Sequence, residues 1–201
     1  MSSTVEFYFD FGSPTTYLAW TQLPRLCEEA GATLVYKPIL LGGIFQATGN
    51  ASPATIPAKG RYMGADLPRF ARRYGVPFAF NPHFPINTMT LMRIATALCA
   101  ARADEFELFL RTVFLAMWVD AKDLGNPEVL AQTLTAAGLD APALLATASD
   151  PKVKDALKAA TGEAVERGAF GAPTMFVGEE MFFGQDRLDF VKEALLARRQ
   201  P

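Results

Sequence analysis

Hydrophobic and polar residues alternate in a short segment near the N-terminus, which predicts a β-strand. The segment reads VEFYF (residues 5–9), and its β-branched and aromatic residues are typical of strands. The turn sequence DFGSPTT follows, and apolar residues then recur at helical spacing until Gly31 provides a stop signal. We predict a helix over about residues 14–30, kinked or interrupted at Pro24.

The middle of the chain has a helical pattern. A second strand, TLVYKPI (residues 33–39), completes a βαβ-like start, and the glycine-, proline- and asparagine-rich segment 40–61 predicts a loop. Apolar residues then follow the helical period as far as Gly168. The expected helices cover residues 66–74, 88–101, 104–119, 126–137 and 151–167.

Strand character returns near the C-terminus. TMFV (174–177) and MFF (181–183) flank a turn, and a last helix is expected over about residues 186–199. This order predicts an α/β fold, a thioredoxin-like domain interrupted by an all-helical insertion. The thioredoxin-like domain would comprise residues 1–45 and 168–201, and the helical insertion residues 46–167.

Composition limits the possible functions. The chain has 201 residues, half of them hydrophobic, and a net charge of −2, so it can bury one large core or two modest ones. No basic excess suggests a nucleic-acid partner. The N-terminus, MSSTVE, lacks the features of a signal peptide, and no stretch is long enough to span a bilayer. We expect a cytoplasmic protein with no membrane partner.

The cysteines and the histidine point away from metal and dithiol chemistry. Cys27 and Cys99 form no C-x-x-C pair, and we interpret both as small core residues. His83 is the only histidine and lies in the proline-rich segment FNPHFPI, which predicts a loop with a surface or packing role. The carboxylates have no ligand spacing around it, so we expect no metal site.

Ser13 is the first candidate functional residue. It precedes Pro14, which suits the first position of a helix, so Ser13 falls at the helix cap. The positive end of the helix dipole favours anions there, and a thiolate could be held beside the hydroxyl. An ordinary capping serine remains the alternative on this segment alone.

The order of elements resembles the DsbA-like branch of the thioredoxin superfamily. In that branch the active residue follows the first strand and a cis-proline lies opposite it; the matching places here are Ser13 and GAPTMF (171–176). SPTT (13–16) stands where those oxidoreductases carry a cysteine pair, which argues against a DsbA-like disulfide exchanger.

More specifically, the chain resembles the 2-hydroxychromene-2-carboxylate isomerases and, less closely, the kappa-class glutathione transferases. The resembling motifs occur in the expected order over nearly the whole chain. They are FDFGSPTTYLA (9–19), Gly49 with Asn50, KGRYM (59–63) with Asp66 and Leu67, PKVK (151–154) and GAFGAPTMFVGEEMFFGQDRL (168–188).

The resemblance implies a glutathione site. Ser13 would donate its hydroxyl proton to the sulfur and favour the thiolate, so its role is that of a stabiliser and not a nucleophile. The main chain of Ala172, before a cis-Pro173, would pair with the cysteinyl part like a short antiparallel strand. The other implied cofactor-binding residues are Asn50, Lys59, Gln185 and Asp186.

Gln185 and Asp186 match the positions that bind the γ-glutamyl end in the family, although Asp186 could equally be a helix cap. Lys59 matches the lysine for the glycyl carboxylate, and Asn50 a polar contact in the same loop. Both could instead be ordinary solvated residues.

An aromatic, anionic substrate would occupy a cleft between the two domains, with Arg61 or amides binding its carboxylate. The candidate lining residues are Tyr17, Phe45, Arg61, Tyr62, Asn87 and Trp118. Met89, Met92, Met117 and Trp118 have helical spacing, which is more typical of a core. The family has arginine or polar residues after its Phe-Pro segment, whereas PINTMT (85–90) stands here, so the substrate is less constrained than the glutathione site.

The resemblance therefore implies a glutathione-dependent isomerase of 2-hydroxychromene-2-carboxylate or a related unsaturated aromatic pyruvate, acting in the catabolism of aromatic compounds. Transient addition of the thiolate, rotation about a bond and elimination would accomplish the isomerisation. A homodimer is typical of the family. The alternatives are a kappa-type transferase and a non-catalytic thioredoxin-like protein that binds a peptide or partner beside Pro173.

Overall fold

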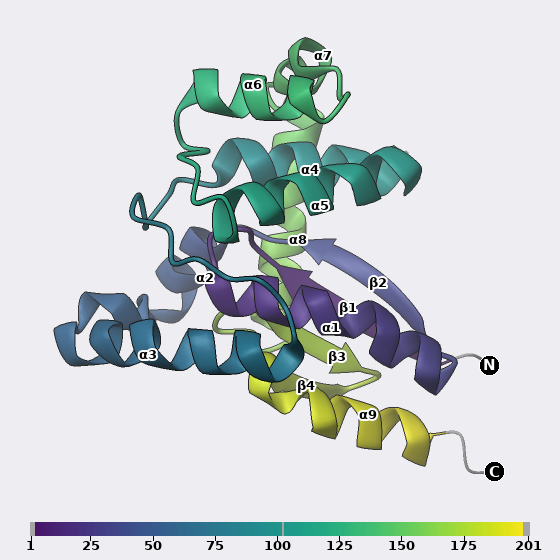
Figure 1. Ribbon diagram of the computed structural model, residues 1–201. Coiled ribbons are helices and arrows are strands. Elements are labelled where there is room, and N and C mark those ends of the chain that lie inside the picture. The colour runs from purple at the N-terminus through teal and green to yellow at the C-terminus, as the bar shows by residue number, and fades with distance from the viewer. Residues whose placement is uncertain (1–2, 102, 199–201) are drawn as a thin grey trace.

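A four-stranded mixed sheet forms the centre of the computed structural model, which describes residues 3–101 and 103–198. The strands follow the order β2-β1-β3-β4, with β1 parallel to β2 and antiparallel to β3, and β3 antiparallel to β4 (Figure 1). Their bounds are β1 (Thr4–Phe9), β2 (Thr33–Pro38), β3 (Thr174–Val177) and β4 (Glu180–Phe183). This is the α/β fold that the sequence predicts.

Helices cover both faces of the sheet and extend from it on one side (Figure 1). The first three are α1 (Pro14–Ala30), α2 (Leu41–Thr48) and α3 (Pro57–Tyr74), with the 3₁₀ turn η1 (Pro53–Thr55) between the last two. The next five are α4 (Met89–Ala101), α5 (Ala103–Trp118), α6 (Pro127–Ala136), α7 (Ala141–Thr147) and α8 (Pro151–Glu166). The 3₁₀ turn η2 (Gln185–Arg187) leads into α9 (Leu188–Ala197).

Alternation along β1 divides the core between the two faces of the sheet. Phe7 and Phe9 belong to the main hydrophobic cluster, which also contains buried side chains of α1, α5 and α9. Tyr8 points the other way and packs with Ile44 of α2 and Ala164 of α8. Both faces of β1 are buried, so this strand carries the turn that precedes α1 on a rigid support.

The segment 40–61 is not the loop that its glycines and prolines predict. It contains α2 and the start of α3, which begins at Pro57 instead of at residue 66. The N-cap of α2, Leu40, makes no side-chain cap bond, so the local sequence lacks the usual start signal. The N–H groups of Leu40 and Leu41 are bound instead by Thr161 Oγ1 (3.0 Å) and Asp10 Oδ2 (2.8 Å), which are distant in sequence.

Three other features differ from what the sequence predicts. Of the kink or interruption expected at Pro24, the interruption does not occur: α1 is continuous from Pro14 to Ala30, and the neighbouring Leu23 and Cys27 are buried in the core. The seven-residue helix α7 was not predicted; Asp140 caps it by accepting from Ala143 N. Cys99 is exposed, and its thiol donates to the Tyr36 carbonyl at 3.4 Å, so it is not a core residue.

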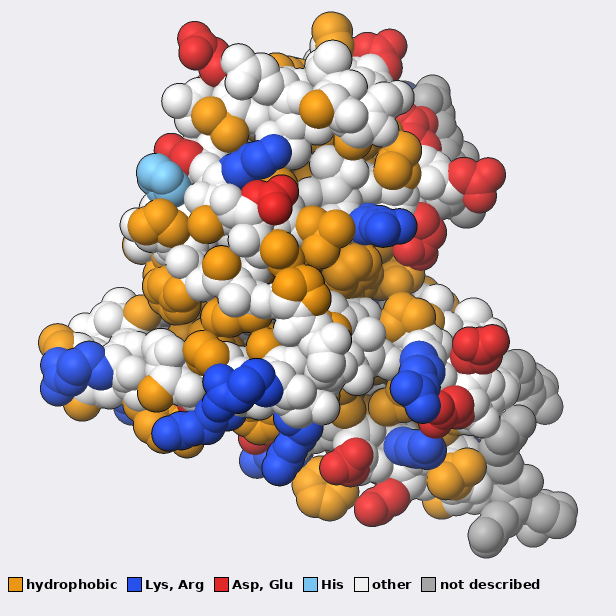
Figure 2. All heavy atoms as spheres, in the orientation of Figure 1, with side chains coloured by type: hydrophobic (Ala, Val, Ile, Leu, Met, Phe, Trp, Pro, Cys, Tyr) orange, Lys and Arg blue, Asp and Glu red, His pale blue; other side chains and the backbone are white. Residues whose placement is uncertain are grey.

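One helix on the face shown in Figure 2 carries a row of cations. Lysine and arginine side chains gather along α3, at the lower left of Figure 2, in contrast to the mixed charges elsewhere on this face. No helix in the described ranges is long and apolar enough to cross a bilayer.

The division of the chain into two domains at residues 45/46 and 167/168 stays a prediction. Helix α8, which was assigned to the insertion, packs against both α2 and α4.

Candidate functional site

Ser13 lies at the N-terminus of α1, with 6% of its surface exposed. Its Oγ accepts a hydrogen bond from Thr16 N at 3.2 Å, which is the capping bond expected of a serine there. The same Oγ lies 2.8 Å from Thr15 Oγ1 and donates to the carbonyl of Ala172 at 2.9 Å. The hydroxyl therefore joins the helix terminus to a loop 159 residues further along the chain.

The Ala172–Pro173 peptide bond is cis and lies in the loop that enters β3. The Ala172 carbonyl accepts from Ser13, while the Ala172 N–H, in a residue with 7% exposure, donates to no group among the described residues. A buried N–H without an acceptor is costly. This edge of the loop therefore offers one donor and one acceptor to an extended ligand.

Two contacts hold the loop in place. Asn50 Nδ2 donates to the Phe170 carbonyl at 2.8 Å, which connects the α2–α3 region to the loop. The Phe183 ring packs over Gly171 so closely that a Cβ on Gly171 would lie 2.7 Å from Phe183 Cε2. Only glycine fits there without displacing the ring, so Gly171 and Phe183 together fix the approach to Ala172.

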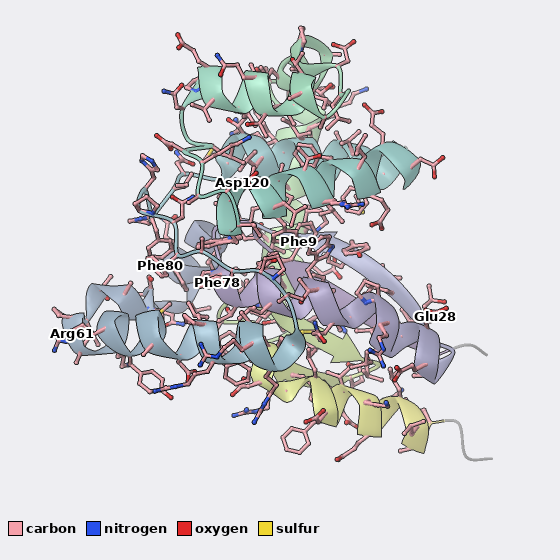
Figure 3. All side chains as sticks on the ribbon, in the orientation of Figure 1. Phe9, Glu28, Arg61, Phe78, Phe80 and Asp120 are labelled. Atoms are coloured by element: carbon pink, nitrogen blue, oxygen red, sulfur yellow. The ribbon has the colours of Figure 1, made fainter. Side chains whose placement is uncertain are left out.

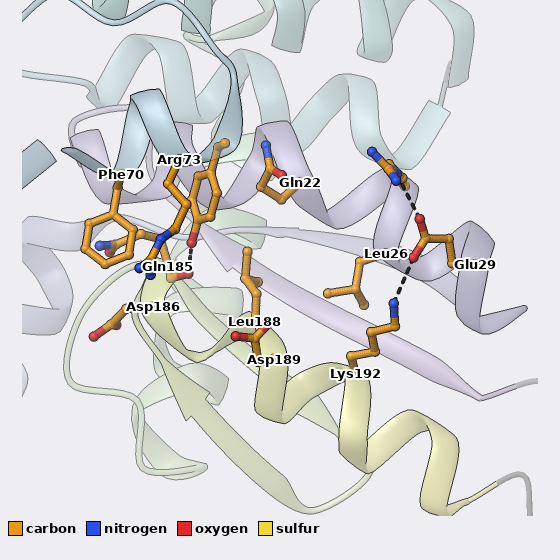
Figure 4. Close-up of a pocket in the computed structure, with 12 residues that line it drawn as sticks. Gln22, Leu26, Glu29, Phe70, Arg73, Gln185, Asp186, Leu188, Asp189 and Lys192 are labelled. Atoms are coloured by element: carbon orange, nitrogen blue, oxygen red, sulfur yellow. Dashed lines mark hydrogen bonds and ion pairs between the residues drawn. The ribbon is translucent and has the colours of Figure 1, made fainter. Parts of the chain in front are cut away.

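The 3₁₀ turn η2 is the third element of the candidate site, after the N-terminus of α1 and the loop before β3. Gln185 is buried, and its carbonyl accepts from the Tyr74 hydroxyl of α3 at 2.6 Å. Asp186 is exposed and pairs with Arg187 at 2.6 Å. Both residues border a cavity of about 370 Å³ between α1, α3 and α9 (Figure 4). Ser13 is not among the residues that line this cavity, which extends away from it along α1.

Asp10 lies directly after β1 and before the turn that carries Ser13, and it is fully buried. Its Oδ1 accepts from Gly12 N at 2.9 Å and from the Thr88 hydroxyl at 2.7 Å. Desolvation raises the pKa of the Asp10 carboxyl, and the hydrogen bonds from Thr88, Gly12 and Leu41 oppose that rise.

The model of the DSBA-like thioredoxin domain family matches residues 4–196 of this chain. A 2-hydroxychromene-2-carboxylate isomerase of Sphingobium xenophagum is 36% identical over 98% of this chain and 100% of its own length. The chain belongs to the 2-hydroxychromene-2-carboxylate isomerase family. A solved structure of such an isomerase superimposes with a TM-score of 0.85 at 32% identity, covering 98% of this chain and 97% of the other. Glutathione S-transferase kappa 1 of Rattus norvegicus is 29% identical, over 93% of this chain and 88% of its own length.

The described residues fit the glutathione that this isomerase family implies. The unpaired Ala172 N–H is a buried donor that the carbonyl of a cysteinyl residue could satisfy. The Ala172 carbonyl, which now accepts from Ser13, could accept from the N–H of the same residue. Ser13 would then direct its hydroxyl to the sulfur, at the positive end of α1.

Two of the predicted substrate residues lie in the core of this isomerase-family fold and not on a cleft. Trp118 is fully buried, and its Nε1 donates to the Phe11 carbonyl at 2.8 Å. Tyr17 has 1% exposure and donates to the Pro77 carbonyl at 2.6 Å; burial raises its pKa to about 12. Neither side chain presents a surface to a substrate. The expectation that they line the cleft is therefore corrected: both hold backbone segments in place from the core.

Of the remaining predicted residues, Phe45 is half-buried and the others described next are at the surface. Arg61 lies near the outer end of α3 (Figure 3) and is exposed, as is Lys59. Asn87 is exposed and its Oδ1 accepts from Met89 N at 3.1 Å, at the start of α4. Phe78 and Phe80 lie in the segment between α3 and α4 and approach Trp118, with ring centroids 6.3 and 6.5 Å from it.

Sequence reasoning missed Thr15 and Tyr74. Thr15 is part of the SPTT segment, and a second hydroxyl two residues into a capped turn is a signal that could have indicated it. Nothing local indicates Tyr74, because its partner Gln185 is 111 residues away.

Proposed function

We propose that this protein is a glutathione-dependent isomerase of 2-hydroxychromene-2-carboxylate or a related unsaturated aromatic pyruvate. The observation that carries the proposal is the 2.9 Å hydrogen bond between Ser13 Oγ and the carbonyl of Ala172, which places a hydroxyl, a helix N-terminus and a free amide N–H together. The full-length similarity to an isomerase supports the choice of reaction.

Each group at the site has a physical role in the proposal. Glutathione, when bound, supplies a thiolate that can add reversibly to a conjugated double bond, which permits rotation before elimination. The Ser13 hydroxyl donates a hydrogen bond to the sulfur, and the dipole of α1 adds a favourable potential. The Thr15 hydroxyl, 2.8 Å from the Ser13 hydroxyl, donates a second hydrogen bond towards the sulfur or orients the serine hydroxyl.

The cofactor's two ends would be held by separate elements. Gln185 and Asp186, on η2, would bind the γ-glutamyl group, with the Asp186 carboxylate accepting from its ammonium. Lys59 of α3 would bind the glycyl carboxylate, and Asn50 would hold the loop before Ala172. Arg61 and Asn87 would contact the carboxylate and polar groups of the substrate from the exposed side.

Difference absorbance in the ultraviolet tests this proposal. Glutathione is titrated into the protein near neutral pH and thiolate absorbance is recorded, with S-methylglutathione as the control ligand, whose sulfur cannot ionise. We expect thiolate absorbance with glutathione alone, followed by isomerisation of a chromene carboxylate without net loss of glutathione. Binding without turnover of any substrate would favour the non-catalytic alternative, and absence of binding would contradict the cofactor assignment.

A kappa-type transferase is the second candidate, because kappa-class transferases are similar over almost the full chain. Incubation with glutathione and a halogenated nitroaromatic compound separates the two. A transferase consumes glutathione in proportion to product, whereas an isomerase returns it.

We also propose that the protein is a homodimer. Light scattering coupled to size exclusion should give twice the chain mass of 21.9 kDa. A monomeric mass at micromolar concentration would contradict this.

A further inference from the structure

Asp10 is the only carboxylate, ammonium or guanidinium group in the buried class among the described residues. Its surroundings consist of hydrogen-bond donors. Gly12 N and the Thr88 hydroxyl donate to Oδ1 at 2.9 and 2.7 Å, and Leu41 N donates to Oδ2 at 2.8 Å. These three donors suit an ionised carboxylate, which only accepts hydrogen bonds. A protonated acid would also need an acceptor for its own proton, and none of these three groups is one.

The three donors come from three separate parts of the fold. Gly12 belongs to the turn before α1, Leu41 is the first residue of α2, and Thr88 immediately precedes α4. A single carboxylate thus joins the turn of the candidate site to the helices on either side of it. The first turns of α1, α2 and α4 carry no charged residue, and no ionisable group contributes to the shift in the Asp10 pKa.

The link between Asp10 and the Ser13 turn is tight. Ser13 N donates to the backbone carbonyl of Asp10 at 3.2 Å. A Cβ on Gly12 would lie 3.2 Å from Thr88 Cγ2 and 3.4 Å from Asp10 Oδ1, so Gly12 is confined between the two side chains. The buried carboxylate and a thiolate held by Ser13 would therefore be two anions at one short turn, residues 10–13.

We propose that Asp10 is a positioning residue for the thiolate site, which fixes the turn carrying Ser13 and, through its buried charge, limits how readily the bound thiol loses its proton. The inference rests on the proposed binding of glutathione. Like charges close together in a poorly solvated region disfavour each other's ionised forms. The Ser13 hydroxyl and the α1 dipole favour the thiolate, while Asp10 opposes it.

The test is the pKa of the bound glutathione thiol, measured by thiolate absorbance in wild type, Asp10→Asn and Thr88→Val. Asp10→Asn removes the charge and should lower that pKa by about one unit, a tenfold change in the thiolate-to-thiol ratio at fixed pH. Thr88→Val removes one hydrogen bond but keeps the charge, so the thiol pKa should not fall. An unchanged or raised thiol pKa in a folded, glutathione-binding Asp10→Asn protein would overturn the proposal.

A measurement on the wild-type protein covers the case in which Asp10→Asn does not fold. Coupling between two sites is reciprocal, so a bound thiolate must raise the pKa of Asp10 as much as Asp10 raises that of the thiol. Infrared titration of the buried carboxyl, in protein with ¹³C-labelled aspartate, should show a higher pKa with glutathione sulfonate, whose sulfur group stays anionic at every pH used, than with S-methylglutathione, whose sulfur group stays neutral. Equal values would refute the proposal while leaving glutathione binding intact; no binding by calorimetry would refute both.

Discussion

Two hydroxyl groups 2.8 Å apart, those of Ser13 and Thr15, lie at the positive end of α1. Both also approach the Ala172 carbonyl, at 2.9 and 3.4 Å. A helix N-terminus favours an anion where its N–H groups are free, so the main chain of α1 already supplies a positive potential. The two hydroxyls add hydrogen-bond donors to it. Removing one hydroxyl should therefore weaken the site without abolishing it.

Ser13→Ala should raise the pKa of the bound glutathione thiol by about one unit and lower kcat about tenfold, with a smaller change in the dissociation constant of glutathione. Thr15→Val should do the same to a lesser extent. Since Thr15 can partly replace the lost donor, the double variant should lose more than the sum of the two single effects. Thiolate titration and steady-state kinetics measure these effects, and an unchanged thiol pKa in the double variant would remove both hydroxyls from the mechanism.

Gly171→Ala should destabilise the protein by about 1–3 kcal/mol and weaken glutathione binding, because the new Cβ would meet the Phe183 ring at 2.7 Å. Phe183→Leu in the same chain should recover much of both losses. Gly162→Ala is the matched control, since nothing lies within 4 Å of its Cβ position on α8. Chemical denaturation and calorimetry give the two quantities; a Gly171→Ala protein as stable as wild type would contradict the close packing.

At the scale of the elements, long-range contacts hold the site's parts together. Tyr74 connects α3 to η2, and Asn50 connects the segment after α2 to the cis-proline loop. Trp118 of α5 binds the turn before α1 through the Phe11 carbonyl. The helices inserted between β2 and β3 therefore support the candidate site directly.

Tyr74→Phe should lower the free energy of unfolding by about 1 kcal/mol, because the Gln185 carbonyl loses its donor. If η2 binds the γ-glutamyl group, the KM for glutathione should rise several-fold while kcat changes little. Tyr62→Phe serves as the control, because Tyr62 lies on the same helix with 62% exposure. Equal KM values for the two variants would show that the Tyr74 bond does not affect the cofactor site.

At the scale of the whole molecule, a charged cluster fastens α8 to the sheet. Arg167 donates to Glu6 and to the Tyr8 hydroxyl, both at 2.8 Å, and its guanidinium lies 3.9 Å from the Phe176 ring centroid. Tyr8 in turn donates to Glu163 at 2.9 Å. Burial and the bond to Glu163 raise the pKa of Tyr8 to about 12.

This shift predicts a loss of stability in alkali. A folded-state pKa above the usual 10 means that the contribution of Tyr8 is complete below pH 10 and is lost as the pH rises towards 12. Tyr8→Phe should be less stable than wild type at pH 8, and the difference should narrow between pH 10 and 12. Denaturant unfolding across this range measures it, and a constant difference would mean that Tyr8 ionises equally in both states.

The sequence determined most of the strands and helices of this protein and the family-defining residues, because these depend on local patterns. Alternation identified β1, the Ser13–Pro14 pair identified the start of α1, and TMFV identified β3. The cis bond before Pro173 was expected from the resemblance and is present. Such features need only the period of apolar residues and the chemistry of a cap or turn.

Only the tertiary structure decided which residues meet at the site and which are buried. The start of α2 could not be predicted because its first N–H groups are bound by Asp10 and Thr161, and not by a local cap. Tyr17 and Trp118 were both predicted to line a cleft, although the spacing of Trp118 is more typical of a core, and burial assigns both to the core. A one-dimensional pattern records how often apolar residues recur, whereas a contact between residues 13 and 172 depends on how the whole chain packs.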